Sequence, residues 1–254
     1  MKIGVHVWIV AAASLVASGN GAFATTIDAD AYYAGSIPVA SGTGLNGLYY
    51  GQPATAGNVA DDTYVASNSP VATFLSTGID YPTGVTGSSY ADTNTLANFL
   101  SPDAGSLSVP SAGSNTLGNQ LITFTGYIAL QAGTTTLQLG VDDGGYVNIG
   151  GVGFGSPGTI IDNDGDHAYA IVQGSVTVTN AGLYPIYIDY HEDGGNTGLS
   201  FQYGTGDVVP ASVLYPSAPV PEPASMILLG IGGLSMLWFG RGRRWINPRC
   251  FRAS

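Results

Sequence analysis

Apolar and polar residues alternate along Leu121–Gly150, which reads LITFTGYIALQAGTTTLQLGVDDGGYVNIG. Apolar residues recur at every second position in three runs: Ile122, Phe124, Ile128 and Leu130, then Leu137, Leu139 and Val141, then Val147 and Ile149. Ala132-Gly133 and Asp143-Gly144-Gly145 separate the runs with residues that favour turns. Successive side chains of a β-strand point to opposite faces, so a period of two predicts strands with one buried face. The stretch therefore predicts antiparallel β-structure.

The same alternation continues towards the C-terminus. Its apolar members are Val176 and Val178, then Tyr184, Ile186, Ile188 and Tyr190, then Leu199, Phe201 and Tyr203. Upstream, residues 25–120 are rich in Gly, Ser, Thr, Asn and Ala, and they offer one short helix around Thr93–Leu100, which Pro102 would end. The prediction is an all-β domain, built as an antiparallel sandwich or barrel.

The N-terminus has the three parts of a secretory signal peptide. Met1-Lys2 is basic, Ile3–Val16 is apolar, and Ala22-Phe23-Ala24 supplies the small residues that a signal peptidase recognises. We therefore expect residues 1–24 to be removed, with cleavage before Thr25. The alternative is an uncleaved N-terminal anchor.

The C-terminus carries a second apolar segment of 17 residues, at 224–240. This length is at the lower limit for a transmembrane helix. Five of the six basic residues of the chain follow it. Because basic residues flank membrane helices on the cytoplasmic side, residues 241–254 are predicted to form a cytoplasmic tail, with the main domain on the other side of the membrane.

This end of the chain resembles the PEP-CTERM sorting signal of Gram-negative bacteria. The resemblance rests on the order of a Pro-Glu-Pro motif, an apolar helix and an Arg cluster, here Pro221, Glu222 and Pro223, then 224–240, then Arg241, Arg243 and Arg244. It implies transient anchoring in the inner membrane, processing by an exosortase, and delivery to the cell surface or the extracellular space. Residues 245–254 extend beyond the usual end of such a signal and have no assigned role.

The part expected to be exported is strongly acidic. Between Thr25 and Val220 it contains 15 Asp, one Glu and neither Lys nor Arg, a net charge of −16 with neutral His. Carboxylates without cationic partners must be screened by salt or met by bound cations. Nucleic acid is excluded as a partner, because binding phosphates needs cationic side chains. The only cysteine, Cys250, lies in the tail, so the exported part has neither disulfides nor thiol chemistry.

Asp142-Asp143 is the most informative acidic group, and it admits two interpretations. A hairpin turn explains Asp143-Gly144 but leaves Asp142 unexplained. Alternatively, the pair binds a hard cation such as calcium, which takes six to eight oxygen ligands and prefers carboxylates and carbonyls.

Two further acidic clusters follow. The first, Asp162–His167, begins like an EF-hand loop, but its sixth residue is His167, its twelfth is Gln173, and the pattern predicts no flanking helices. We reject the EF-hand and favour a solvated acidic loop. The second, His191–Asn196, lies between two alternating runs and is interpreted first as a hairpin loop.

Several motifs, in order, resemble those of a PA14 domain, the β-sandwich found in bacterial toxins, glycosidases and yeast adhesins. They are Gly44–Tyr50, Phe124–Ile128, Ala132–Thr134, Val141–Gly145 with Ile149–Gly151, Ile160–His167, Ala181–Ile186 and Val209–Tyr215. The resemblance implies a sandwich over residues 45–216, preceded by an irregular segment, 25–44, and followed by a linker, 217–223.

The resemblance also implies a binding site. In carbohydrate-binding members of that family, two Asp residues joined by a cis peptide bind calcium, and the calcium coordinates sugar hydroxyls. This role falls on Asp142 and Asp143. A loop carrying an Asn completes the site in those members. Here the loop is His191–Gly198, and Glu192 takes the place of the Asn as third metal ligand, with Asn196 as a second candidate.

Other side chains near these ligands are candidate contacts to a bound glycan: His191, Asp193, Asn196 and Tyr146. The ring of Tyr146 could stack on a sugar, although a Tyr in a strand commonly serves packing.

We expect binding rather than catalysis. The exported part has only two histidines, His167 and His191, and neither the pattern of a nucleophilic triad nor that of a zinc site surrounds them. Three functions remain open: a calcium-dependent glycan-binding module at the cell surface or in an exopolysaccharide (biofilm) matrix, a structural matrix protein that binds no sugar, and an exported polysaccharide hydrolase with paired carboxylates.

Overall fold

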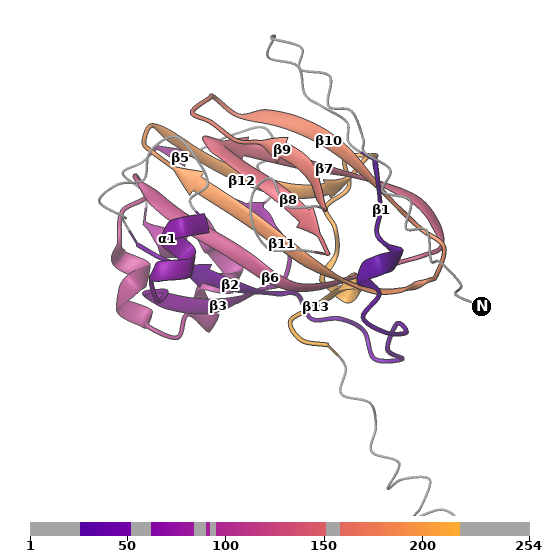
Figure 1. Ribbon diagram of the computed structural model, residues 1–254. Helices are drawn as coiled ribbons and strands as arrows, with labels where there is room; N and C mark the ends of the chain where they lie inside the picture. Colours follow the sequence, from indigo (N-terminus) through magenta and orange to yellow (C-terminus); the bar gives the residue numbers. More distant parts are fainter. Residues whose placement is uncertain (1–25, 52–61, 84–89, 92–94, 151–157, 219–254) are drawn as a thin grey trace, which may run out of the picture. The chain divides into compact units, whose positions relative to one another are not determined.

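The alternating stretches form two β-sheets in a computed structural model of the chain (Figure 1). The structure describes residues 26–51, 62–83, 90–91, 95–150 and 158–218. The predicted signal peptide with its cleavage site, the Pro-Glu-Pro motif, the sorting helix and the basic tail lie outside the described residues. Among the residues that are described, no helix has the length and apolar character needed to cross a bilayer.

The first sheet is mixed rather than purely antiparallel. Its order is β1 (Thr26–Asp28), β10 (Ala170–Val178), β7 (Gly133–Asp142), β12 (Asn196–Tyr203) and β4 (Asp80–Tyr81), and β5 (Tyr90–Ala91) also pairs with β12. β1 runs parallel to β10, whereas β7 and β12 pair antiparallel with their neighbours. β1 lies in the segment 25–44, which was predicted to be irregular. That prediction is wrong for β1, because three residues are too few to show a periodic pattern.

The second sheet contains the longest strands. Its order is β3 (Ala72–Ser76), β2 (Leu45–Tyr49), β6 (Gln120–Leu130), β11 (Gly182–Glu192), β8 (Gly144–Ile149) and β9 (Thr159–Asn163), and β13 (Leu214–Tyr215) also pairs with β6. β11 pairs with β6 along its whole length, from Gly182 opposite Leu130 to Glu192 opposite Gln120. The six alternating runs of the sequence are thus confirmed as β6, β7, β8, β10, β11 and β12.

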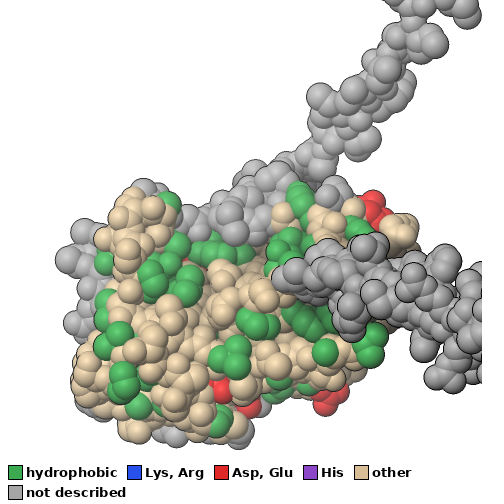
Figure 2. Space-filling model, turned by 90° about the horizontal axis from the view of Figure 1, so that it is seen from below, with side chains coloured by type: hydrophobic (Ala, Val, Ile, Leu, Met, Phe, Trp, Pro, Cys, Tyr) green, Lys and Arg blue, Asp and Glu red, His purple; other side chains and the backbone are tan. Residues whose placement is uncertain are grey.

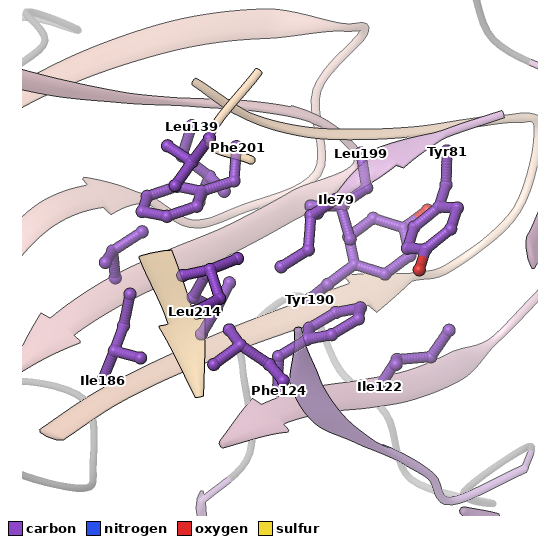
Figure 3. Close-up of a cluster of buried hydrophobic side chains, with 14 of the residues drawn as sticks. Ile79, Tyr81, Ile122, Phe124, Leu139, Ile186, Tyr190, Leu199, Phe201 and Leu214 are labelled. Carbon is purple, nitrogen blue, oxygen red and sulfur yellow. The ribbon is translucent and has the colours of Figure 1, made fainter. Parts of the chain in front are cut away.

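The core lies between the two sheets and consists of the apolar members of the alternation. Figure 3 shows side chains of β6 and β11 facing those of β7 and β12, among them Phe124, Tyr190, Leu139 and Phe201. These four residues are fully buried. Burying an aliphatic or aromatic side chain of this size stabilises a fold by about 1.5–3 kcal/mol. The hydrophobic faces of the two sheets therefore hold the sandwich together.

Several short helices lie between the strands along the chain. They are α1 (Asp62–Ser67), α2 (Leu96–Leu100) and the 3₁₀ helices η1 (Asp30–Tyr32), η2 (Ser101–Ser106), η3 (Pro110–Ser114) and η4 (Ala211–Val213). α2 confirms the helix predicted around Thr93–Leu100, and η2 follows it directly, with Pro102 near its start. The Thr95 hydroxyl accepts a hydrogen bond from the Asn98 N–H and so caps α2. α1 was not predicted, because six residues show too little of a helical period.

Two of the acidic segments, the one at Asp142-Asp143 and the one at His191–Asn196, connect strands of different sheets. β7 ends at Asp142 in the first sheet, and β8 begins at Gly144 in the second. In the opposite direction, β11 ends at Glu192 in the second sheet, and β12 begins at Asn196 in the first. A hairpin joins two strands of one sheet, so the hairpin interpretation is wrong for both segments. Asp142 pairs with Gly198 and Gly144 with His191, which places both crossovers at the same end of the sandwich.

Candidate functional site

We call the end of the sandwich where both crossovers lie the acidic tip, and we define it by Asp142–Gly144, Asp164–Asp166 and His191–Asn196. The peptide bond between Asp142 and Asp143 is cis, as the PA14 resemblance implies. Both residues are buried, with exposed fractions of 5% and 8%. The Asp193 N–H donates a hydrogen bond to Oδ2 of Asp143 over 2.8 Å. The loop after β11 is therefore bonded directly to the acidic pair.

Glu192 lies fully buried beside this pair. Its Oε2 accepts a hydrogen bond from the Tyr190 hydroxyl (3.0 Å), and its Oε1 accepts one from the Gly194 N–H (2.9 Å). The Tyr190 hydroxyl also lies 2.9 Å from the carbonyl oxygen of Asp142. The three predicted metal ligands, Asp142, Asp143 and Glu192, thus lie at the two crossovers, and the charges of Asp143 and Asp142 act on Glu192.

The carboxylates of the tip repel one another. Burial, followed by the negative charge of Asp143, raises the pKa of Glu192 to about 8. Burial also raises the pKa of Asp143, although the hydrogen bond from the Asp193 backbone opposes this shift. Both shifts show that negative charge is unfavourable at the tip when no cation is bound.

The donors at the tip are chemically suited to a hard cation, because carboxylate oxygens are the ligands that calcium prefers. Among the described residues, however, no group of three or more His, Cys, Asp or Glu side chains is arranged to hold a metal ion. Calcium takes six to eight oxygens, so a bound ion would also need neutral oxygens from backbone carbonyls, amides, hydroxyls, water or the ligand.

His191 contacts the third acidic segment of the tip, Asp164–Asp166. It is 1% exposed, with Nδ1 3.3 Å from Oδ1 of Asp164 and Nε2 3.5 Å from Oδ1 of Asp166. Burial alone would lower the pKa of this imidazole, but hydrogen bonding and charge from Asp164, and then from Asp166, outweigh burial and raise it. Asp164, 8% exposed at its side chain, therefore lies in the tip, and the prediction of a solvated loop is wrong for this residue.

Sequence reasoning missed this contact because it depends on strand pairing. Gly145 of β8 lies opposite Asn163 of β9, so the residues after β9 reach the start of β8. A Cβ added at Gly144 would lie 2.4 Å from Cε1 of His191 and 2.7 Å from the backbone nitrogen of Gly165. The absence of a side chain at Gly144 is therefore what lets the acidic loop approach His191.

Replacing Gly144 with Ala is expected to lower the free energy of unfolding by about 1–3 kcal/mol, the usual cost of overpacking. The new methyl group meets backbone atoms and a buried ring, neither of which can move cheaply. Urea denaturation without calcium measures the effect. Gly105→Ala is the matched control, since a Cβ there has no neighbour within 4 Å. Equal midpoints for the two variants would contradict the close approach.

The remaining candidate contacts divide between the surface and the interior. Asp193 and Asn196 are exposed at the rim of the tip, where a ligand can reach them. Tyr146 is fully buried and packs against Tyr187, with ring centroids 5.8 Å apart. Its ring is not open to a sugar in this structure, which corrects its assignment as a ligand contact and leaves the packing role.

The surface of the described residues carries no Lys or Arg at all. On the face in Figure 2, apolar groups and a few carboxylates lie among the backbone and the remaining side chains, and no Lys or Arg is visible on the described residues. Histidine is therefore the only side chain in the described part of the tip that can carry positive charge.

The chain forms a mostly β, two-sheet domain with an acidic tip at the crossovers between the sheets. A family model described as "PA14 domain" matches residues 83–210, and one described as "PEP-CTERM protein-sorting motif" matches residues 219–244. The chain belongs to the PA14 domain family and carries the PEP-CTERM sorting motif.

Solved PA14 domains share the fold. The PA14 domain of MpAFP antifreeze protein is 25% identical, with a TM-score of 0.58 over 74% of this chain and 97% of that domain. The PA14 sugar-binding domain from an RTX adhesin is also 25% identical, with a TM-score of 0.55 over 69% of this chain and 99% of that domain. No curated protein sequence matches the chain.

Proposed function

We propose that this chain is an exported glycan-binding protein whose acidic tip holds calcium and, through it, a sugar. The observation that carries the proposal is that three buried acidic residues, Asp142, Asp143 and Glu192, lie at the two crossovers between the sheets and influence one another electrostatically. No Lys or Arg of the described chain is available to offset their charge. The similarity to the sugar-binding PA14 domain of an RTX adhesin supports the same function.

Each part of the tip would have a separate role. Asp142, Asp143 and Glu192 would hold calcium, which supplies positive charge and open coordination positions for sugar hydroxyls. The N–H groups of Asp193 and Gly194 orient Asp143 and Glu192. The exposed Asp193 and Asn196 can hydrogen-bond further hydroxyls of the glycan.

The sorting motif supports a location outside the cytoplasm. Its match to residues 219–244 indicates export with exosortase processing in a Gram-negative cell. We infer transient anchoring in the inner membrane and final delivery to the cell surface or an exopolysaccharide matrix. A glycan of that matrix is the partner that this location offers.

The burial of Tyr146 favours a second candidate, a structural matrix protein that binds calcium but no sugar. In that case the ion would fix the crossovers without presenting a ligand. The two candidates differ in glycan binding and not in calcium binding.

A glycan array probed with the purified full-length chain in mild detergent tests the proposed function. We expect retention on a subset of glycans in millimolar calcium and its loss in excess EGTA, because the ion forms part of the sugar contact. A blank array, together with a melting temperature that rises with calcium, would favour the structural candidate. Indifference to calcium in both measurements would refute both.

A further inference from the structure

Gln120 is a buried polar residue for which the fold alone gives no reason. It is fully buried, and neither Oε1 nor Nε2 has a hydrogen-bond partner among the described residues. Buried side-chain amides in native proteins are nearly always hydrogen-bonded, because leaving one unpaired costs stability. An unpaired amide at a fully buried position therefore needs an explanation.

The position of Gln120 in the sheet suggests an explanation for its unpaired amide. It begins β6, directly opposite Glu192 at the end of β11. Directly opposite residues of an antiparallel pair project from the same face, with Cβ atoms about 4.5–5.5 Å apart. Ile122 and Tyr190, the next opposite pair on this face, belong to the core between the sheets. The side chains of Gln120 and Glu192 therefore share the inner face at the acidic tip.

The facing sheet contributes a second residue of this kind. Thr197 of β12 is fully buried, and its hydroxyl has no hydrogen-bond partner within the described ranges. It lies two positions before Leu199, a core residue, and so projects from the inner face of the first sheet. The inner faces of both sheets thus carry an unpaired polar group towards the tip end of the core.

We propose that Gln120 is a positioning residue, whose amide N–H donates a hydrogen bond to the Glu192 carboxylate when the tip holds calcium. The inference rests on the proposed function. Each Glu192 oxygen accepts one hydrogen bond in this structure, and a carboxylate oxygen can accept about two, so both have capacity left. A neutral amide directs the carboxylate without adding a cation that would compete with calcium. The Thr197 hydroxyl supplies a second neutral group on the opposite side.

The test replaces Gln120 with Met, which has a similar shape but no hydrogen-bonding amide. We expect the calcium dissociation constant of the full-length chain, measured by isothermal titration, to rise about tenfold, as it does when a residue that orients a metal ligand is removed. The calcium-free melting temperature should stay the same or rise, because an unpaired buried amide has been removed. A purely structural role predicts a lower melting temperature and an unchanged dissociation constant.

Gln202→Met is the matched control. Gln202 is 2% exposed, its Nε2 is also unpaired among the described residues, and it lies four positions along β12 from Gly198, which pairs with Asp142. Four residues of a strand span about 13 Å, so this amide cannot reach the tip. The control should leave calcium affinity unchanged.

A double-mutant cycle with Glu192→Gln decides whether Gln120 acts through Glu192. We expect the loss of calcium affinity in the double variant to be smaller than the sum of the two single losses. Additive losses, or wild-type affinity in Gln120→Met, would overturn the positioning role while leaving the calcium site intact. Absence of calcium binding by the wild type would overturn the proposed function as well. If Gln120→Met fails to fold, Gln120→Asn makes the same test, since its shorter amide falls short of Glu192.

Discussion

Calcium is expected to stabilise the wild-type chain and to have no effect on the double variant Asp142→Asn with Asp143→Asn. At a calcium concentration 100 times the dissociation constant, binding to the folded state alone raises the free energy of unfolding by about 2.7 kcal/mol. The variant removes two of the three buried carboxylates at the crossovers. It keeps an acceptor oxygen at residue 143 for the Asp193 N–H, so the calcium-free fold should survive.

Thermal denaturation in calcium and in EGTA measures this difference, and circular dichroism checks the fold. The control is Asp28→Asn with Asp207→Asn, which removes the same charge from two exposed positions and should respond to calcium like the wild type. If calcium still stabilises the tip variant, the acidic pair does not hold the ion. If the variant unfolds without calcium, the pair serves the crossover itself.

The second large effect is a dependence on pH. Without calcium, the free energy of unfolding is expected to fall as the pH rises from about 5 to about 8. The pKa of Glu192 is raised from 4.5 to about 8 in the folded chain, so over this range the folded state keeps a proton that the unfolded state releases. The contribution of Glu192 to the free energy of unfolding is therefore complete below its pKa in the unfolded chain, and it is lost as the pH rises through its pKa in the folded chain.

The size of this effect is a few kcal/mol, since one pKa unit corresponds to about 1.4 kcal/mol. Asp143 and His191, whose pKa values are also raised, act in the same direction. Urea denaturation in EGTA at several pH values measures the slope, and Glu192→Gln should remove most of it, because the amide does not titrate. A flat wild-type profile, or an equal slope in the variant, would show that Glu192 keeps an ordinary pKa in the folded chain.

The strands could be predicted from the sequence where they are long enough to repeat. β6 and β11 each have 11 residues, and their alternation identifies them without any relative. β4 and β5 have two residues each, so they form no periodic pattern, and only their pairing with β12 defines them. The limit of prediction here is the length of the element.

The site was less predictable than the fold, because alternation shows which residues face inward but not which sheet a strand joins. Asp143-Gly144 has the composition of a hairpin turn, yet β7 and β8 belong to different sheets. Glu192 was named as a metal ligand only through the PA14 resemblance. The contact between His191 and Asp164 depends on the pairing of β8 with β9 and has no local signal in the sequence.

The crossovers have a mechanical consequence. The first described strand, β1, belongs to one sheet and the last, β13, to the other, so tension on the two ends of the domain pulls one sheet against the other. An ion shared by Asp142, Asp143 and Glu192 would link the two crossovers and oppose that sliding. The domain would then resist mechanical unfolding more strongly with calcium bound. Single-molecule pulling with and without the ion would measure this as a difference in unfolding force.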